Sequence, residues 1–136
     1  MPTRRQFLST TSATVAALLL PVRSARAARP PGPHPTPRPG ITGAKVLTRE
    51  QLADRPKLVS LFDSVREIPA VIDGIRCNCG CGGQEGFYSL LSCYEGKDAM
   101  ARDCGICQGQ GRMAARLHKA GKSLDEIRVG VDAKYG

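Results

Sequence analysis

The chain has 136 residues, with 20 Lys and Arg against 12 Asp and Glu, six Cys, only six aromatic residues and no Trp. Its length fits one small domain, which buries a limited core and usually gains stability from metal or disulfide cross-links. Acidic and basic residues alternate and aromatic side chains are scarce, so the composition argues against a nucleic-acid-binding surface.

The first 27 residues form a predicted twin-arginine signal peptide. Arg4 and Arg5 precede Phe7-Leu8, an apolar run follows at 13–20, and the small residues around Arg26 predict cleavage after Ala27. The apolar run is far shorter than the roughly 20 residues that span a bilayer, so no transmembrane anchor is expected after cleavage. The mature chain is therefore expected in the periplasm or outside the cell, with a net charge of 16 − 12 = +4.

Residues 28–41 are rich in proline and predict a linker with polyproline II conformation. His34 lies in this segment and is expected to be solvated. Residues 42–136 are predicted to form a single cysteine-rich domain.

The first half of this domain is predicted to be helical. Thr48 and Gln51 fit a capping box, and Pro56 suits the first turn of a helix that begins after Asp54 and stops before Pro69. Apolar residues recur at helical spacing in it: Leu58, Leu61, Phe62 and Val65. Residues 69–75 are short and apolar, and an extended conformation is expected there.

A glycine-rich loop follows and carries Cys77, Cys79 and Cys81. Residues two apart on an extended backbone lie roughly 6.6 Å apart on the same side, whereas disulfide-bonded Cβ atoms lie about 3.8 Å apart. The spacing therefore favours three ligands leaning toward a shared metal over a disulfide between neighbours.

Helices are predicted again after the loop. A short helix is expected at 87–91, just before Cys93, and Asp103 is expected to cap a helix from about Cys104 to Ala120. Cys104 and Cys107 would then lie at a helix N-terminus, where the thiolate is stabilised. Ser123 opens a last helix with an apolar stripe of Leu124, Ile127, Val131 and Tyr135. The predicted fold is mainly α, with little or no β structure and the cysteine loop between helices.

All six cysteines lie between positions 77 and 107, and together they predict a soft-metal site. The ligands would be Cys77, Cys79 and Cys81 as a strip, Cys104 and Cys107 as a clamp, and Cys93 as a bridge or lid. An all-sulfur set of more than four ligands favours Cu(I), with Zn(II) second, in metal storage, delivery or sensing. The receiving partner would be a metalloprotein or a membrane complex. His118 lies about three turns from Cys107 and is not expected to be a ligand.

Two alternatives remain open. One is thiol-disulfide exchange through Cys104 and Cys107, and the other is a binding module held by three disulfides. No catalytic triad, phosphate loop or paired carboxylates indicate hydrolytic chemistry, and the sequence leaves open whether any reaction is catalysed.

The ordered cysteines and the closing segment 121–128 resemble the PCYCGC-motif family of small exported bacterial proteins, over about residues 69–136. Arg76 replaces the proline of the family motif and Asn78 replaces its tyrosine. The resemblance implies an exported, cysteine-rich helical domain behind a tether. Residues 104–136 also resemble the CcmH-type subunit of cytochrome c maturation, which implies thiol exchange at Cys104 and Cys107. The other four cysteines have no counterpart there.

Overall fold

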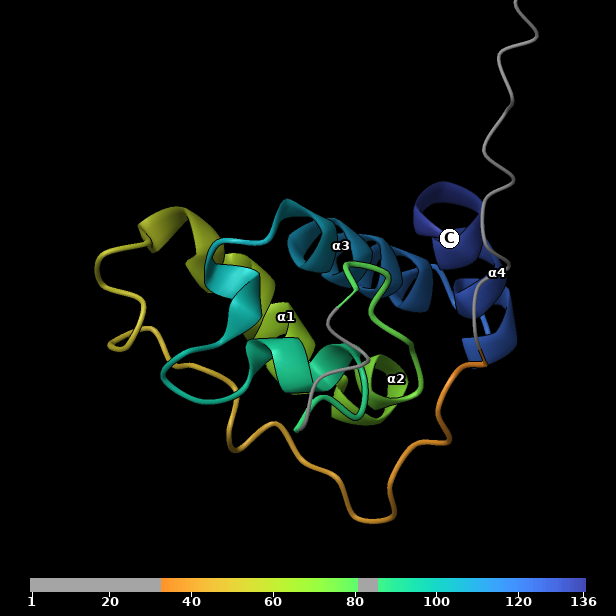
Figure 1. The fold of residues 1–136 in the computed structure, drawn as a ribbon, viewed down its shortest axis with the longest axis horizontal. Helices are drawn as coiled ribbons and strands as arrows, with labels where there is room; N and C mark the ends of the chain where they lie inside the picture. The colour runs from red at the N-terminus through yellow and green to blue at the C-terminus, as the bar shows by residue number, and fades with distance from the viewer. Residues whose placement is uncertain (1–32, 81–85) are drawn as a thin grey trace, which may run out of the picture.

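The computed structural model describes residues 33–80 and 86–136 (Figure 1). The predicted signal peptide at 1–27 lies outside the described residues, as do the first residues of the proline-rich segment. Cys81 and the loop glycines Gly82 and Gly83 also lie outside them. Statements below on what the fold contains concern the described part.

Helix α1 spans Val59–Glu67 and is preceded by the 3-10 turn η1, Pro56–Leu58. The sequence prediction of a helix near Pro56 that ends before Pro69 is confirmed. Its apolar face is buried, with Phe62 and Val65 fully inaccessible. Thr48 and Gln51 exchange the two predicted hydrogen bonds, at 2.9 and 3.4 Å, but residues 49–54 form turns instead of a helix.

The segment after α1 forms a second short helix, α2, over Pro69–Asp73. The expectation of an extended segment was wrong. Proline at the first helical position has the required φ and lacks only an N–H that would have no partner there, so Pro69 begins a new helix as well as ending the old one. Ile72 and Asp73 of α2 are fully buried.

Two 3-10 helices follow the cysteine loop. Helix η3 spans Leu90–Tyr94, slightly later than predicted, and η4 spans Met100–Arg102. Ser89 caps η3 and its hydroxyl accepts a hydrogen bond from the Leu91 amide at 3.2 Å. The β structure in the described residues is a single antiparallel bridge between Val46 and Glu95.

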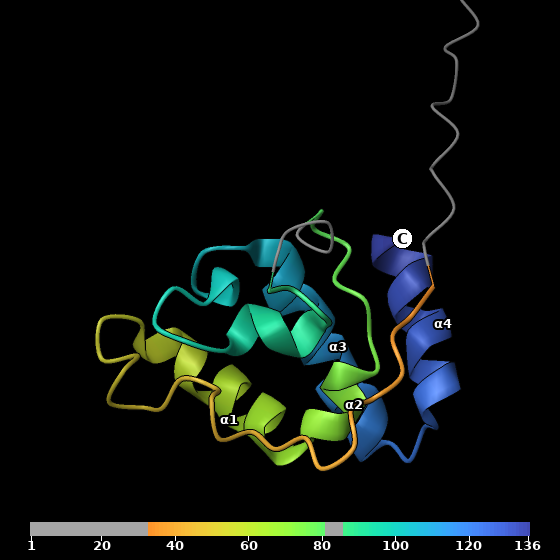
Figure 2. The ribbon, with the colours of Figure 1, turned by 60° about the horizontal axis from the view of Figure 1, so that its bottom comes forward.

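The longest helices close the domain. Helix α3 spans Gly105–Lys119 and α4 spans Leu124–Tyr135, and they pack against each other along one side of the molecule (Figure 2). Gly121 separates them with a φ of 80°, a left-handed conformation that glycine adopts without steric cost. Ser123 and Glu126 form the predicted capping box of α4, and Ile127 and Val131 from its apolar stripe are fully buried.

Residues 33–40, which we call the N-terminal strap, lie across the domain (Figures 1 and 2). Arg38 donates to the buried carboxylate of Asp73 through its side chain at 2.7 and 3.1 Å and its amide at 2.8 Å. The Tyr88 hydroxyl donates to the carbonyl of Thr36 at 2.5 Å. The Arg38 guanidinium also lies 4.7 Å from the centre of the Tyr88 ring. The described part of the proline-rich segment is thus attached to the domain by specific contacts.

The interior is one hydrophobic core to which every helix contributes. Phe62 and Tyr94 meet edge to face at its centre, with ring centroids 4.8 Å apart. The mainly helical fold, with cysteines between the helices, is therefore as predicted. Among the described residues, no helix combines the length and apolar character needed to cross a membrane.

Candidate metal centre

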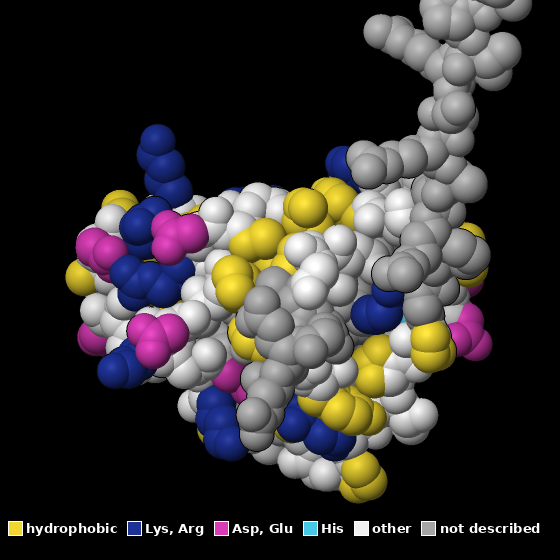
Figure 3. Space-filling model, viewed as in Figure 1, with side chains coloured by type: hydrophobic (Ala, Val, Ile, Leu, Met, Phe, Trp, Pro, Cys, Tyr) yellow, Lys and Arg dark blue, Asp and Glu magenta, His cyan; other side chains and the backbone are white. Residues whose placement is uncertain are grey.

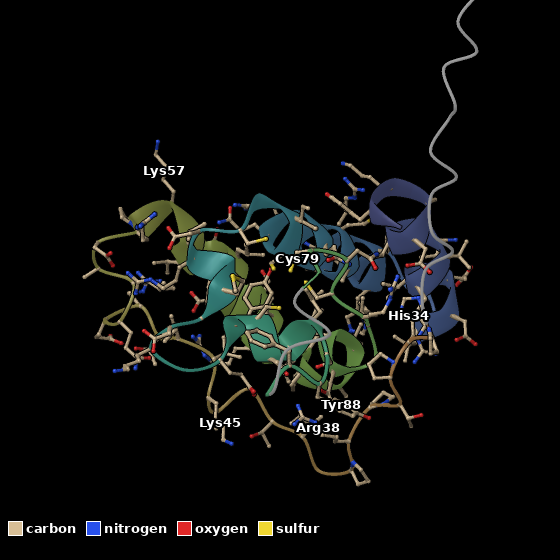
Figure 4. All side chains as sticks on the ribbon, viewed as in Figure 1. His34, Arg38, Lys45, Lys57, Cys79 and Tyr88 are labelled. Carbon is tan, nitrogen blue, oxygen red and sulfur yellow. The ribbon has the colours of Figure 1, made fainter. Side chains whose placement is uncertain are left out.

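Four cysteines come together in the core between α3, η3 and the loop that follows α2. The sulfur atoms of Cys77, Cys79, Cys93 and Cys107 all lie within 4.8 Å of one another. Figure 4 shows sulfur atoms gathered around the labelled Cys79, beneath the N-terminal half of α3. Residues 30 positions apart in the chain thereby contribute to one site.

The sulfur separations suit a thiolate-bound metal. The Sγ atom of Cys77 lies 3.1 Å from that of Cys79 and 3.4 Å from that of Cys107, and the Cys79 and Cys107 sulfurs are 3.6 Å apart. Sulfurs at 2.3 Å from a tetrahedral ion lie roughly 3.8 Å from one another. A small outward movement of these side chains would accommodate the ion.

The cluster is closed to solvent on most sides. Cys93 and Cys107 are fully buried and Cys77 is 5% exposed. Cys93 belongs to η3, whose preceding cap fixes its backbone. The carbonyl of Cys107 accepts a 2.6 Å hydrogen bond from the buried Tyr94 hydroxyl. These positions are therefore fixed by the core.

The cluster concentrates negative charge on Cys77. Hydrogen bonds from Cys107 and Cys93 outweigh burial and lower the pKa of the Cys77 thiol from 9.0 to about 3. The pKa of Cys107 is raised, first by its hydrogen bond to Cys77 and then by its contact with Cys93 and by burial. For Cys93, the hydrogen bond to Cys107 lowers the pKa, but the contact with Cys77 and burial raise it overall. The contacts within the cluster thus favour the thiolate form at Cys77 and the protonated form at Cys93 and Cys107.

The remaining sulfur positions differ from the predicted six-ligand set. Cys104 is a free, partly buried thiol outside the four-sulfur cluster, and Cys81 lies outside the described residues. Cys104, and not Asp103, occupies the N-cap of α3, where its sulfur accepts a hydrogen bond from the Cys107 amide at 3.5 Å. The short side chain of the cysteine replaces the expected carboxylate as the cap.

Cys79 also differs from its neighbours. Its sulfur takes part in a disulfide, a state that the triplet spacing did not predict, whereas Cys77, Cys93, Cys104 and Cys107 are free thiols. Four free cysteines are incompatible with a framework of three disulfides. The structure therefore does not support the disulfide-held module.

Several polar residues around Cys77 were not identified from the sequence. The Asn78 amide donates to Gln110 at 2.9 Å, and the Gln110 side chain donates to the Arg76 carbonyl at 3.0 Å. His34, expected to be solvated, is only 14% exposed and bonds to Asp132 at 2.9 Å. His118, by contrast, is exposed and not part of the cluster. No signal in the sequence identifies Gln110, because its partners Asn78 and Arg76 lie 32 and 34 residues away.

The outer surface near the centre is apolar. Ile106 is 42% exposed between Cys104 and Cys107. Figure 3 shows hydrophobic side chains gathered over the region of α3, with acidic and basic side chains intermixed beside them at one end of the domain.

Comparison of the chain with models of protein families, with curated proteins and with solved structures found no match. The function must therefore be argued from the site itself.

Proposed function

We propose that this chain is an exported soft-metal-binding protein that holds Cu(I) at the cysteine cluster. The observation that carries the proposal is the convergence of four sulfurs within 4.8 Å of one another in the core. Three of them belong to buried free thiols, Cys77, Cys93 and Cys107.

The donor set favours a soft cation. Thiolate ligands select Cu(I), Zn(II) and iron-sulfur clusters over hard cations such as Mg²⁺ or Ca²⁺. In the part of the chain that the structure describes, no histidine or carboxylate belongs to the cluster. We favour Cu(I) because three free thiols suffice for it, whereas a structural zinc requires four ligands. Cys79 would join as a fourth sulfur after reduction of its disulfide, and Zn(II) would then become a competitor.

Protons on the buried cysteines compete with metal binding. The hydrogen bonds from Cys107 and Cys93 favour the charged form of Cys77, because they lower its thiol pKa to about 3. Metal binding must displace the protons on Cys93 and Cys107, whose pKa values are raised. Affinity should therefore increase with pH, since each bound proton competes with the metal.

Thiol-disulfide exchange is less well supported. An attacking cysteine needs an accessible thiolate. Cys107 is fully buried, and its pKa is raised by the hydrogen bond to Cys77, by the contact with Cys93 and by burial. The helix N-terminus at Cys104 and Cys107 does not overcome these effects at Cys107, so the sequence-based expectation of a lowered pKa was wrong there.

The proposal of export rests on the twin-arginine pattern at 1–27 and the small residues before the predicted cleavage position. The resemblance to the PCYCGC-motif family agrees with it. A storage, delivery or sensing role outside the cytoplasm would follow from both.

Metal titration of the mature, metal-free chain, prepared anaerobically without a disulfide reductant so that Cys79 keeps its disulfide, tests the proposal. Cu(I) or Zn(II) is offered in competition with a colorimetric chelator, and the wild type should retain Cu(I) at about one equivalent. Cys107→Ser should weaken retention by at least about 100-fold, because a buried ligand is removed. Cys104→Ser is the matched control and should bind like the wild type. Equal losses in both variants, or no retention by the wild type, would contradict the site.

A further inference from the structure

The backbone on both sides of Cys77 is held by side chains from distant segments. The Arg76 amide donates to Nδ1 of His34 at 3.1 Å, and the Arg76 carbonyl accepts from Gln110 at 3.0 Å. The Asn78 amide donates to the same Gln110 side chain at 2.9 Å. Gln110 is fully buried on α3. The peptide groups that flank Cys77 are therefore fixed from two sides.

His34 connects this segment to α4. Its Nδ1 accepts the Arg76 N–H, so in the neutral ring Nε2 carries the hydrogen and donates to Asp132 Oδ2 at 2.9 Å. The other Asp132 oxygen accepts a hydrogen bond from the Asn78 side chain at 3.3 Å. His34, Arg76, Asn78 and Asp132 thus form a closed ring of contacts beside Cys77. Figure 4 shows His34 next to α4.

Both ring nitrogens of His34 are used in these contacts, so His34 is not available as a direct ligand. Its position on the strap is itself secured, since Arg128 of α4 donates to the carbonyl of Pro35 at 2.9 Å. The imidazole is therefore held by its own side-chain contacts and by the neighbouring backbone.

We propose that His34 is a positioning residue of the metal centre, which holds the Arg76–Asn78 backbone so that the Cys77 sulfur faces Cys93 and Cys107. This inference rests on the proposed function and adds the N-terminal strap to the site. Beyond Asn78, Gly80 has a φ of 90°. Glycine has no side chain to restrict its own backbone conformation. Fixing Cys77 before the metal arrives removes an ordering cost from binding.

Three substitutions separate the two bonds of His34. His34→Ala removes both. Asn places an amide oxygen where Nδ1 lies, so His34→Asn keeps the acceptor for the Arg76 amide. Gln reaches the Nε2 position, so His34→Gln keeps only the donor to Asp132. Tyr88→Phe is the control, because it removes the strap's bond at Thr36 without touching the loop.

Cu(I) dissociation constants of the mature chain are measured by chelator competition. We expect His34→Ala and His34→Gln to bind about 10-fold more weakly, as for other partners that orient a ligand, and His34→Asn to stay close to the wild type. Tyr88→Phe should bind as the wild type does. Unchanged affinity in His34→Ala, or an equal loss in Tyr88→Phe, would overturn the proposal.

A second measurement does not depend on metal. Amide hydrogen exchange of Arg76 in the metal-free chain should be at least about 10-fold faster in His34→Ala than in the wild type, and unchanged in Tyr88→Phe. If the wild type binds no metal, the proposed function fails, yet the exchange rate still decides whether His34 fixes the backbone at Cys77. Full protection of the Arg76 amide in His34→Ala would show that it does not.

Discussion

Cys77 is the cysteine whose surroundings most favour the thiolate. Hydrogen bonds from Cys107 and Cys93 lower its pKa from 9.0 to about 3. Between about pH 3 and about pH 9, the unfolded chain keeps a proton on Cys77 that the native chain has released. The free energy of unfolding therefore rises with pH across this range. Above about pH 9 the free energy of unfolding falls as the pH rises, because Cys93 and Cys107 hold protons in the native chain that the unfolded chain releases.

We therefore expect the free energy of unfolding of the metal-free protein to increase from about pH 6 to about pH 8. Urea unfolding at several pH values measures this, and thiolate ultraviolet absorbance reports the charge directly. Cys77→Ser should flatten the pH dependence and abolish the absorbance near neutral pH. Cys104→Ser should keep both the pH dependence of stability and the thiolate absorbance. If the free energy of unfolding of the wild type does not change with pH, the assignment of the thiolate to Cys77 is refuted.

Gly111 allows α3 to approach the core closely. A Cβ atom there would collide with the Tyr94 hydroxyl, which donates to the Cys107 carbonyl. We expect Gly111→Ala to lower the free energy of unfolding by about 2 kcal/mol, the usual cost of overpacking. Thermal or urea unfolding measures the loss. At Gly105 a Cβ would meet nothing within 4 Å, so Gly105→Ala should leave the free energy of unfolding unchanged or slightly higher. Equal losses of stability in the two variants would contradict the packing argument.

The residues that position Cys77 could not have been predicted from the sequence. His34 lies 42 residues before Arg76, its partner, and Gln110 lies 32 residues after Asn78. Nothing local in the chain specifies such pairs, because they form only when the strap, α3 and α4 have packed. The cysteines were predictable as a group because thiols concentrated in one segment are rarely simple core residues.

At the scale of elements, local signals predicted α3 and α4 well. The apolar periodicity and the Ser123 capping box act within one or two turns, and Gly121 ends α3 as expected. The prediction was wrong for α2, where Pro69 was taken as the end of one helix but also begins the next. The attachment of the strap was not predicted, because prolines indicate extended backbone without indicating what it lies on.

Among the contacts that hold the strap, the ion pair of Arg38 reaches the buried Asp73. Burial alone would raise the pKa of this carboxyl, but hydrogen bonds from Arg38 and Ser89 lower it overall. Its contribution to stability is present above about pH 4 and is lost as the pH falls below that value. The carboxylate is fully buried, so removing Arg38 would leave a buried charge without its ionic partner.

We expect Arg38→Ala to destabilise the domain by about 2 kcal/mol, less than a fully buried pair would cost because the guanidinium is partly exposed. It should also release the strap, so limited proteolysis of the mature chain should cut at 33–40 faster than in the wild type. Arg49→Ala removes a more exposed ion pair, to Asp63 at 3.7 Å, and should change neither property. Unchanged stability and cleavage in Arg38→Ala would show that the ion pair does not hold the strap.

At the scale of the whole molecule, the four-cysteine cluster lies where the loop, η3 and α3 meet. Cys93 and Cys107 are members of the same core cluster as Phe62, Tyr94 and Ile127. A metal that binds these cysteines more tightly in the native chain than in the unfolded chain would therefore stabilise the fold as a whole. The small size of the domain makes such a contribution valuable.

The central claim is tested most directly by metal content and thiol accessibility in protein exported by the native route and purified without chelator or reductant. We predict about one equivalent of copper per chain, with Cys77, Cys93 and Cys107 reacting with a thiol reagent only after chelation or unfolding. Metal-free protein whose thiols react freely in the native state, or protein with no free thiols at all, would contradict a buried thiolate metal centre.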